Sequence, residues 1–138
     1  MDFSILDSES FKDILEAEIV KNYHAPVDIV FVEDVADWFA KRSDDCINNP
    51  VSVAVRDGIT GGHGIIMCKE INSDRVESII CRMHFGGFDN AEEILCTPEI
   101  FMRHLILHEL AHISNNWGQD REDDCDAWAF DRLHPSAV

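Results

Sequence analysis

The chain has 138 residues, of which 46% are hydrophobic and 28% are charged, proportions that are ordinary for one globular domain spanning residues 1–138. It contains no run of 18 apolar residues, and its first ten residues carry acids where a signal peptide carries basic residues, so we expect a cytoplasmic protein without a membrane partner. With 27 acidic against 11 basic residues the net charge is −16, which repels phosphate backbones and excludes a nucleic-acid partner.

The first half of the chain predicts a helix, a strand and a second, short helix. Residues 10–22 place apolar side chains at nearly helical spacing, and Pro26 stops that helix. The β-branched run 27–32 predicts a strand. Asp34 can then cap a short helix.

Three strands of a meander are expected next. Residues 51–55 and 65–71 form the first two strands, joined by the glycine-rich turn 58–64. Residues 76–85 are expected to form the third strand, because this run is rich in apolar and β-branched side chains.

Two helices complete the prediction. Thr97 caps the first, Pro98 occupies its first position, and the helix runs to about Asn115. A break at 117–119 separates it from a last helix over 121–133. Four strands followed by two helices predict an α+β domain, in which an antiparallel or mixed sheet of about four strands packs on both helices.

The long helix contains the motif H-E-x-x-H, formed by His108, Glu109 and His112. Two histidines one turn apart stack on one helical face, so both rings can reach one ion. Glu109 lies beside that ion and can act as the base that takes a proton from water. Because two histidines and a carboxylate are costly to bury in an apolar stretch unless paired or metal-bound, the motif predicts a Zn²⁺ site.

A catalytic zinc keeps three protein ligands and one open position, so a third ligand is needed. The last helix supplies acids, and antiparallel packing on the first helix would bring Glu122 and Asp126 near the histidines, since the two lie one turn apart on the same face. Glu122 is the first candidate, and Asp126 and Asp124 are the alternatives.

Over residues 51–133 the chain resembles the gluzincin group of zincin metallopeptidases, and most closely the ImmA/IrrE-type peptidases. The resemblance lies in H-E-x-x-H at 108–112 and in the run E-D-D-C-D-A-W-A-F-D-R-L at 122–133, which is similar to the family pattern E-x-E-A-x-x-F-A-x-x-L-L. It implies that Glu122 is a metal ligand, that Asp126 orients a ligand histidine, and that an edge strand beside the active helix pairs with extended substrate. The chain departs from the family in having only residues 113–121 between His112 and Glu122.

Other side chains are candidates for auxiliary roles. His104 lies one turn before His108 on the same stripe, where it can support the site or bind the metal itself. His84, in the expected third strand, and His63, in the glycine-rich turn, are candidates to stabilise an oxyanion. Most of the cysteines are expected to be small buried hydrophobes, because they are odd in number and include no CxxC pair; they are Cys46, Cys68, Cys81, Cys96 and Cys125.

The sequence therefore predicts a zinc-dependent metallopeptidase that hydrolyses a peptide bond in a protein or peptide substrate. The resemblance implies a specific regulatory protein, such as a transcriptional repressor, as that substrate. Two alternatives remain open: a catalytically inactive zincin fold, and an acidic protein-binding module such as an inhibitor or decoy, whose charge of −16 would suit a basic partner.

Overall fold

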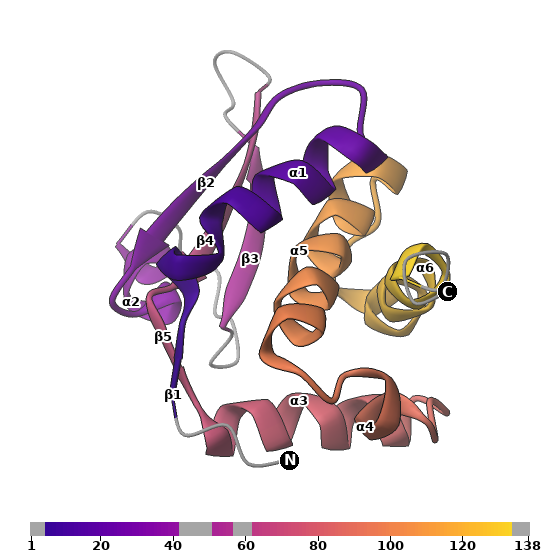
Figure 1. Cartoon of the computed structure of the whole chain (residues 1–138). Helices are drawn as coiled ribbons and strands as arrows, with labels where there is room; N and C mark the ends of the chain where they lie inside the picture. Colours follow the sequence, from indigo (N-terminus) through magenta and orange to yellow (C-terminus); the bar gives the residue numbers. More distant parts are fainter. Residues whose placement is uncertain (1–4, 42–50, 57–61, 134–138) are drawn as a thin grey trace.

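The fold is arranged around one long central helix, α5 (Pro98–Asn115). The computed structural model describes residues 5–41, 51–56 and 62–133, and it places α5 between a small sheet and the C-terminal helix α6 (Glu122–Leu133) (Figure 1). Nearly every side chain from Phe101 to Ala111 is buried, as expected of a helix that is apolar on all sides. The histidines of the motif therefore lie on the most deeply packed element of the molecule.

The ends of α5 confirm the predicted boundaries. Oγ1 of Thr97 accepts a hydrogen bond of 3.2 Å from the backbone N–H of Ile100, and Pro98 occupies the first turn. At the other end Asn116 adopts the left-handed conformation, with φ 54° and ψ 43°, and its N–H caps the carbonyl of His112.

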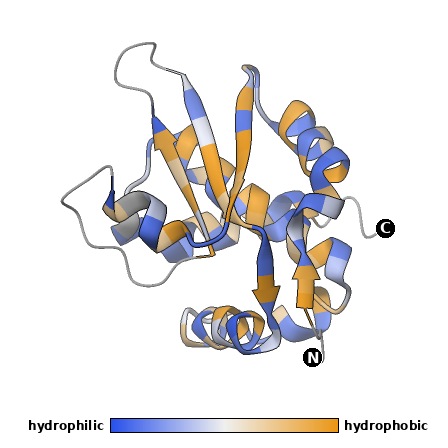
Figure 2. Ribbon diagram, turned by 90° about the vertical axis from the view of Figure 1, so that its left-hand side faces the viewer, coloured by the Kyte–Doolittle hydropathy of each residue, from blue (hydrophilic) through white to orange (hydrophobic). Residues whose placement is uncertain are grey.

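The sheet beside α5 is mixed. Its strands are β2 (Val27–Val32), β4 (His63–Cys68) and β3 (Ser52–Arg56), in the order β2-β4-β3, with β2 parallel and β3 antiparallel to β4. The central strand β4 is buried over residues 65–68, which is typical of a strand covered on both faces (Figure 2). Among the described strands β3 is an edge, and it runs alongside α5 (Figure 1).

The remaining elements extend and cover this core. Strand β1 pairs antiparallel with β5, and α1 packs on α5, where an ion pair joins Glu18 to Arg103. The predicted helix, strand and short helix of the first half are confirmed, including the cap from Asp34 to the N–H of Asp37. These elements are β1 (Ile5–Asp7), η1 (Ser8–Phe11), α1 (Lys12–Asn22), α2 (Val35–Ala40), β5 (Glu70–Asn72) and the unpredicted short helix α4 (Ala91–Ile94).

The predicted third strand of the meander is wrong, because residues 76–85 belong to helix α3 (Ser73–Phe85). Asn72 caps this helix, its Oδ1 accepting a hydrogen bond of 3.0 Å from the N–H of Arg75. The buried side chains of α3 are Val76, Ile79, Ile80 and Met83, a spacing that puts them on one helical face. The β-branched run thus covers the core as a helix.

The predicted glycine-rich turn is described only in part, since residues 57–61 lie outside the described ranges and His63 and Gly64 already belong to β4. Cys46 also lies outside those ranges. Of the other cysteines, Cys68 and Cys125 are buried, whereas Cys81 and Cys96 are exposed, contrary to the expected burial.

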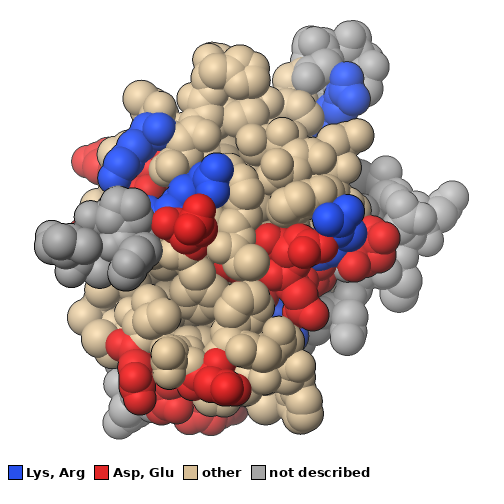
Figure 3. Space-filling model, turned by 90° about the vertical axis from the view of Figure 1, so that its right-hand side faces the viewer, with Lys and Arg blue, Asp and Glu red and all other residues tan. Residues whose placement is uncertain are grey.

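The α+β class is confirmed, with α6 packed on α5 as predicted. No helix in the described ranges is long and apolar enough to cross a membrane. Figure 3 shows acidic side chains in several separate groups on the face near α6, with fewer basic side chains among them.

Candidate metal centre

The candidate site forms where two rows of side chains face each other across the α5–α6 contact. His104, His108 and His112 follow one another at four-residue spacing along α5 and so lie on one stripe. Glu122 and Asp126 are also four residues apart on α6. Glu122 contacts His108 and His112, whereas Asp126 contacts His104 and His108. The contacts run in opposite directions along the two helices, in agreement with the antiparallel packing expected from the sequence.

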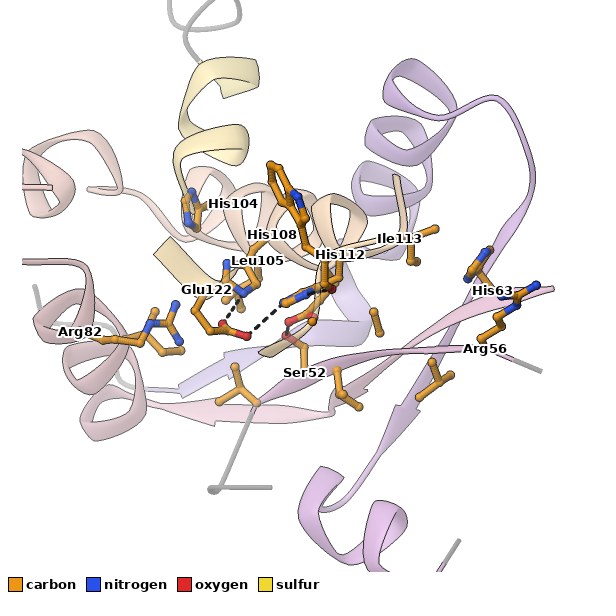
Figure 4. Close-up of a pocket in the computed structure, with 18 of the residues that line it drawn as sticks. Ser52, Arg56, His63, Arg82, His104, Leu105, His108, His112, Ile113 and Glu122 are labelled. Carbon is orange, nitrogen blue, oxygen red and sulfur yellow. Dashed lines mark hydrogen bonds and ion pairs between the residues drawn. The ribbon is translucent and has the colours of Figure 1, made fainter. Parts of the chain in front are cut away.

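Glu122 lies between the two histidines of the motif. Its Oε2 is 2.7 Å from Nε2 of His108, and its Oε1 is 3.1 Å from Nε2 of His112 (Figure 4). The corresponding nitrogens of two rings from α5 thus converge on one carboxylate from α6. Because the carboxylate uses a different oxygen for each ring, one of its oxygens has to turn toward a shared ion for all three groups to bind it.

The opposite nitrogen of each ring faces a hydrogen-bond acceptor. Nδ1 of His108 lies 2.7 Å from Oδ1 of Asp126, and Nδ1 of His112 lies 2.8 Å from the backbone carbonyl of Trp117. A carbonyl can only accept, so Nδ1 of His112 carries a proton and donates it. Histidines that bind metals usually donate their second N–H to a carboxylate or a backbone carbonyl in this way.

The short link between the helices is what brings the Trp117 carbonyl to His112. After α5 ends at Asn115, the left-handed residue Asn116 turns the chain, and a single 3₁₀ turn, η2 (Gln119–Arg121), leads directly into α6. Glu122 is the first residue of α6. The nine residues 113–121 are therefore enough to place Glu122 against both rings.

The carboxylate of Glu109 lies on the same helix but outside this triad. It is buried and accepts a hydrogen bond of 2.7 Å from Oγ of Ser52 on the edge strand β3. Both residues line a cleft of about 770 Å³ that β3, α3 and α5 enclose together with the chain after α5. Glu109, Glu122, His108 and the ring of His112 all open into this cleft, so a substrate entering it would meet them together.

His104 supports the cluster from its buried end. Its Nε2 donates to Oδ1 of Asp126 at 3.0 Å, and its ring packs on that of Phe130, with 4.4 Å between the ring centroids. Its Nδ1 has no hydrogen-bond partner among the described residues. Burial lowers the pKa of His104 by more than Asp126 raises it. His104 is therefore a neutral residue that positions Asp126.

The charges of the metal-free cluster follow from carboxylates that face ring nitrogens. Burial alone would lower the pKa of His108, but hydrogen bonds with Asp126 and Glu122 outweigh it and raise this pKa to about 10. Burial also opposes protonation of His112, yet hydrogen bonds with Cys125 and Glu122 help raise its pKa to about 11. Burial alone would raise the pKa of Glu122, but the two rings lower it to about 2. Protonated rings thus neutralise the carboxylates, a role that a bound cation would take over.

Three other predicted residues, one alternative ligand and two auxiliary histidines, lie away from this cluster. Asp124 has a half-exposed side chain that pairs with Arg121, so the structure does not bring it to the histidines. His84 is exposed near the end of α3 and does not line the cleft. His63 lines the cleft, but at its far end beside Arg56 (Figure 4).

Sequence reasoning missed several groups that complete the site. Ser52 holds Glu109, and Nη2 of Arg82 on α3 lies 3.3 Å from Oδ2 of Asp126. No motif marks either residue, and the carbonyl of Trp117 leaves no trace in a sequence. Cys125, which the family pattern places at a small packing residue, did have a signal: it lies three residues after Glu122, on the same face of α6.

The donor set fits a divalent cation such as zinc. Neighbouring ligands of a tetrahedral zinc bound at about 2.0–2.1 Å lie roughly 3.3 Å apart, whereas the contacts of Glu122 with the two rings, at 2.7 and 3.1 Å, are hydrogen bonds that would lengthen around an ion. In the described part of the chain two groups bring three donor atoms within 4.8 Å of one another, His108, His112 and Cys125, and His104, His108 and Asp126, and Glu122 is in neither group. A cluster of histidines with acidic or thiol partners that could hold a metal ion is therefore present on α5 and α6.

Comparison of the chain with protein-family models, with characterised proteins and with solved structures found no match. The chemistry of this site is therefore what indicates a function.

Proposed function

We propose that this chain is a zinc-dependent metallopeptidase, in which His108, His112 and Glu122 bind the metal and Glu109 is the catalytic base. The observation that carries the proposal is the orientation of the two rings. Both Nε2 atoms face the Glu122 carboxylate, while each Nδ1 faces an acceptor that fixes the ring. This is the arrangement by which proteins prepare histidines to bind a metal.

A zinc ion held there would polarise a scissile carbonyl and make water a better nucleophile at neutral pH. In this proposal Glu109 would take the proton of that water and pass it to the leaving amine. The hydrogen bond from Ser52 occupies one oxygen of Glu109 and fixes the carboxylate, which leaves the other oxygen for proton transfer. Asp126 and the Trp117 carbonyl keep the two rings oriented throughout.

The edge strand β3 supports a peptide as the substrate. One side of β3 pairs with β4, and its residues 52–56 line the cleft that leads to Glu109. An extended peptide can add to such a strand through backbone hydrogen bonds, which do not depend on the peptide's sequence. Side-chain contacts then select particular sequences. The resemblance to ImmA/IrrE-type peptidases supports a regulatory protein as the source of that peptide.

The test is the variant Glu109→Gln, which keeps the size of the side chain and can still accept a hydrogen bond from Ser52. We expect it to bind zinc as the wild type does and to lose about 10²–10⁴-fold in the hydrolysis of a peptide mixture, followed by mass spectrometry. Glu99→Gln, at an exposed position on the same helix, is the matched control and should hydrolyse normally. Full activity of Glu109→Gln would show that another group is the base.

A zinc-loaded wild type that hydrolyses nothing but binds a partner would favour the catalytically inactive zincin. The observation that favours this alternative is Cys125, a possible fourth donor close to both histidines. Four protein ligands fill a structural zinc site and leave no open position for water.

A further inference from the structure

The cluster contains a thiol that the proposed mechanism does not use. Cys125 is fully buried on α6, three residues after Glu122 and therefore on the same helical face. Its Sγ and one ring nitrogen each of His108 and His112 lie within 4.8 Å of one another. The same two histidines that face Glu122 are thus also close to a sulfur atom.

Packing alone does not account for this position. A buried cysteine commonly serves as a small hydrophobic residue, but the Sγ of this thiol also lies within 4.8 Å of a ring nitrogen of His112. It does not line the cleft, so it approaches the histidines from the protein interior, whereas Glu109 lines the cleft. Thiolates are strong ligands for zinc and cobalt and poor ones for magnesium and manganese.

We propose that Cys125 is a ligand of the same metal ion as His108 and His112, so that the ion is held by a thiolate as well as by the Glu122 carboxylate. This inference rests on the proposed metal site and adds a ligand to it. Four protein donors would fill a tetrahedral ion, whereas a catalytic zinc keeps one position open. Cys125 would therefore compete with the water that hydrolysis requires, and it would also favour zinc over harder divalent ions.

Cobalt reports directly on such a ligand. We expect the metal-free full-length protein, titrated with Co²⁺, to develop the visible bands of a tetrahedral ion and an intense near-ultraviolet band from thiolate-to-cobalt charge transfer. Cys125→Ala should lose the near-ultraviolet band and bind cobalt at least about tenfold more weakly, since even the loss of an outer partner of a metal ligand costs that much. Cys81→Ala, which removes an exposed thiol of α3, is the matched control and should keep the band.

The possible results separate this inference from the proposed function. Visible cobalt bands without the near-ultraviolet band in the wild type would overturn the thiolate ligand and leave the histidine and glutamate ligands standing. A near-ultraviolet band that persists in Cys125→Ala would also overturn it, because another thiol would then be the source. Failure of the wild type to bind either cobalt or zinc would overturn the metal site itself. If Cys125→Ala does not fold, Cys125→Ser serves in its place, and the wild-type spectrum still decides.

Discussion

Asp126 is a carboxylate that the protein buries completely and then surrounds with donors. It contacts Nε2 of His104 at 3.0 Å, Nδ1 of His108 at 2.7 Å and Nη2 of Arg82 at 3.3 Å. A buried carboxylate is tolerated only with such partners, and these three donors compensate for the burial of Asp126. The effect on the site is to hold the His108 ring so that its other nitrogen faces Glu122.

Asp126→Asn should therefore weaken metal binding although Asp126 lies behind the histidine. The amide can no longer accept two charge-assisted hydrogen bonds, so we expect zinc affinity to fall about 10–100-fold, as is usual for the loss of an outer partner of a ligand. Competition with a chelator of known affinity measures this loss. Asp124→Asn, on the exposed side of the same helix, is the matched control. Equal losses in the two variants would mean that Asp126 acts only through overall charge.

The raised pKa values of the two rings predict how zinc binding depends on pH. A metal binds neutral imidazole, whereas in the metal-free protein the pKa of His108 is about 10 and that of His112 about 11. At neutral pH the metal must displace both protons, so the affinity should rise about 100-fold for each unit of pH increase. Calorimetry in buffers of different ionisation enthalpy should find about two protons released. Release of none would contradict the protonated state of the rings.

Above pH 6.5, the stability of the metal-free fold should respond to pH in the opposite sense to zinc affinity. Because the pKa of His108 is raised above its ordinary 6.5, the stability that its protonated ring contributes is complete below pH 6.5 and is lost as the pH rises through about 10. The pKa of Glu122 is lowered, so its contribution is present above its ordinary value of 4.5 and is lost as the pH falls toward 2.

Among the elements, the turn between α5 and α6 is the one on which the site geometry depends most. Asn116 is the one residue other than glycine that has positive φ in the described ranges, and asparagine tolerates this conformation better than most residues. Its left-handed backbone directs the next residue back toward α5, where the carbonyl of Trp117 meets His112.

Asn116→Val should disturb both the fold and the metal. A β-branched residue in the left-handed region costs about 1–3 kcal/mol, which denaturant unfolding of the metal-free protein can measure. Zinc affinity should also fall, since relief of that strain moves the Trp117 carbonyl away from His112. Asn116→Gly keeps the left-handed backbone available and is the control expected to resemble the wild type. If valine and glycine behave alike, the turn does not position the ring.

The elements also show what could be foreseen from the sequence. Thr97 and Pro98 mark a helix start through local chemistry alone, so the boundaries of α5 could be predicted. The strand predicted over 76–85 is wrong, because the strand preference of β-branched residues depends strongly on packing. The helical spacing of its buried side chains and the cap at Asn72 were the better signals.

In the site, too, features set by local sequence could be predicted, whereas features set by packing could not. His108, Glu109 and His112 lie within one helical turn, so their sequence spacing nearly fixes their geometry. The positions of Ser52 and Arg82 relative to them depend on how β3 and α3 pack on α5 and α6, which no short pattern in the chain encodes.

At the scale of the whole molecule, the charge of the cleft differs from that of the remaining surface. The chain has a net charge of −16, and acidic groups lie on the face shown in Figure 3. The cleft, in contrast, is lined by Arg56, Arg75 and Arg82, against two carboxylates, Glu109 and Glu122. Figure 4 shows Arg82 and Arg56 toward opposite ends of the cleft, with Glu122 between them. A divalent ion at the histidines would leave this charge unchanged, because it displaces the two ring protons.

A peptide that binds in the cleft should therefore be acidic, although the protein itself is acidic. With Glu109→Gln as the binding form, we expect acidic peptides to bind about tenfold more tightly than basic ones of equal length at low ionic strength, since each exposed charge pair contributes about 0.2–1 kcal/mol. The difference should shrink as salt is added. Arg56→Gln should reduce the preference, whereas Lys12→Gln, at a side chain that pairs with Glu16 on α1, should not. Fluorescence anisotropy with labelled acidic and basic peptides measures these affinities for the binding form and for both further variants. Tighter binding of basic peptides would instead assign recognition to the acidic outer surface, as expected of a protein-binding module with a basic partner.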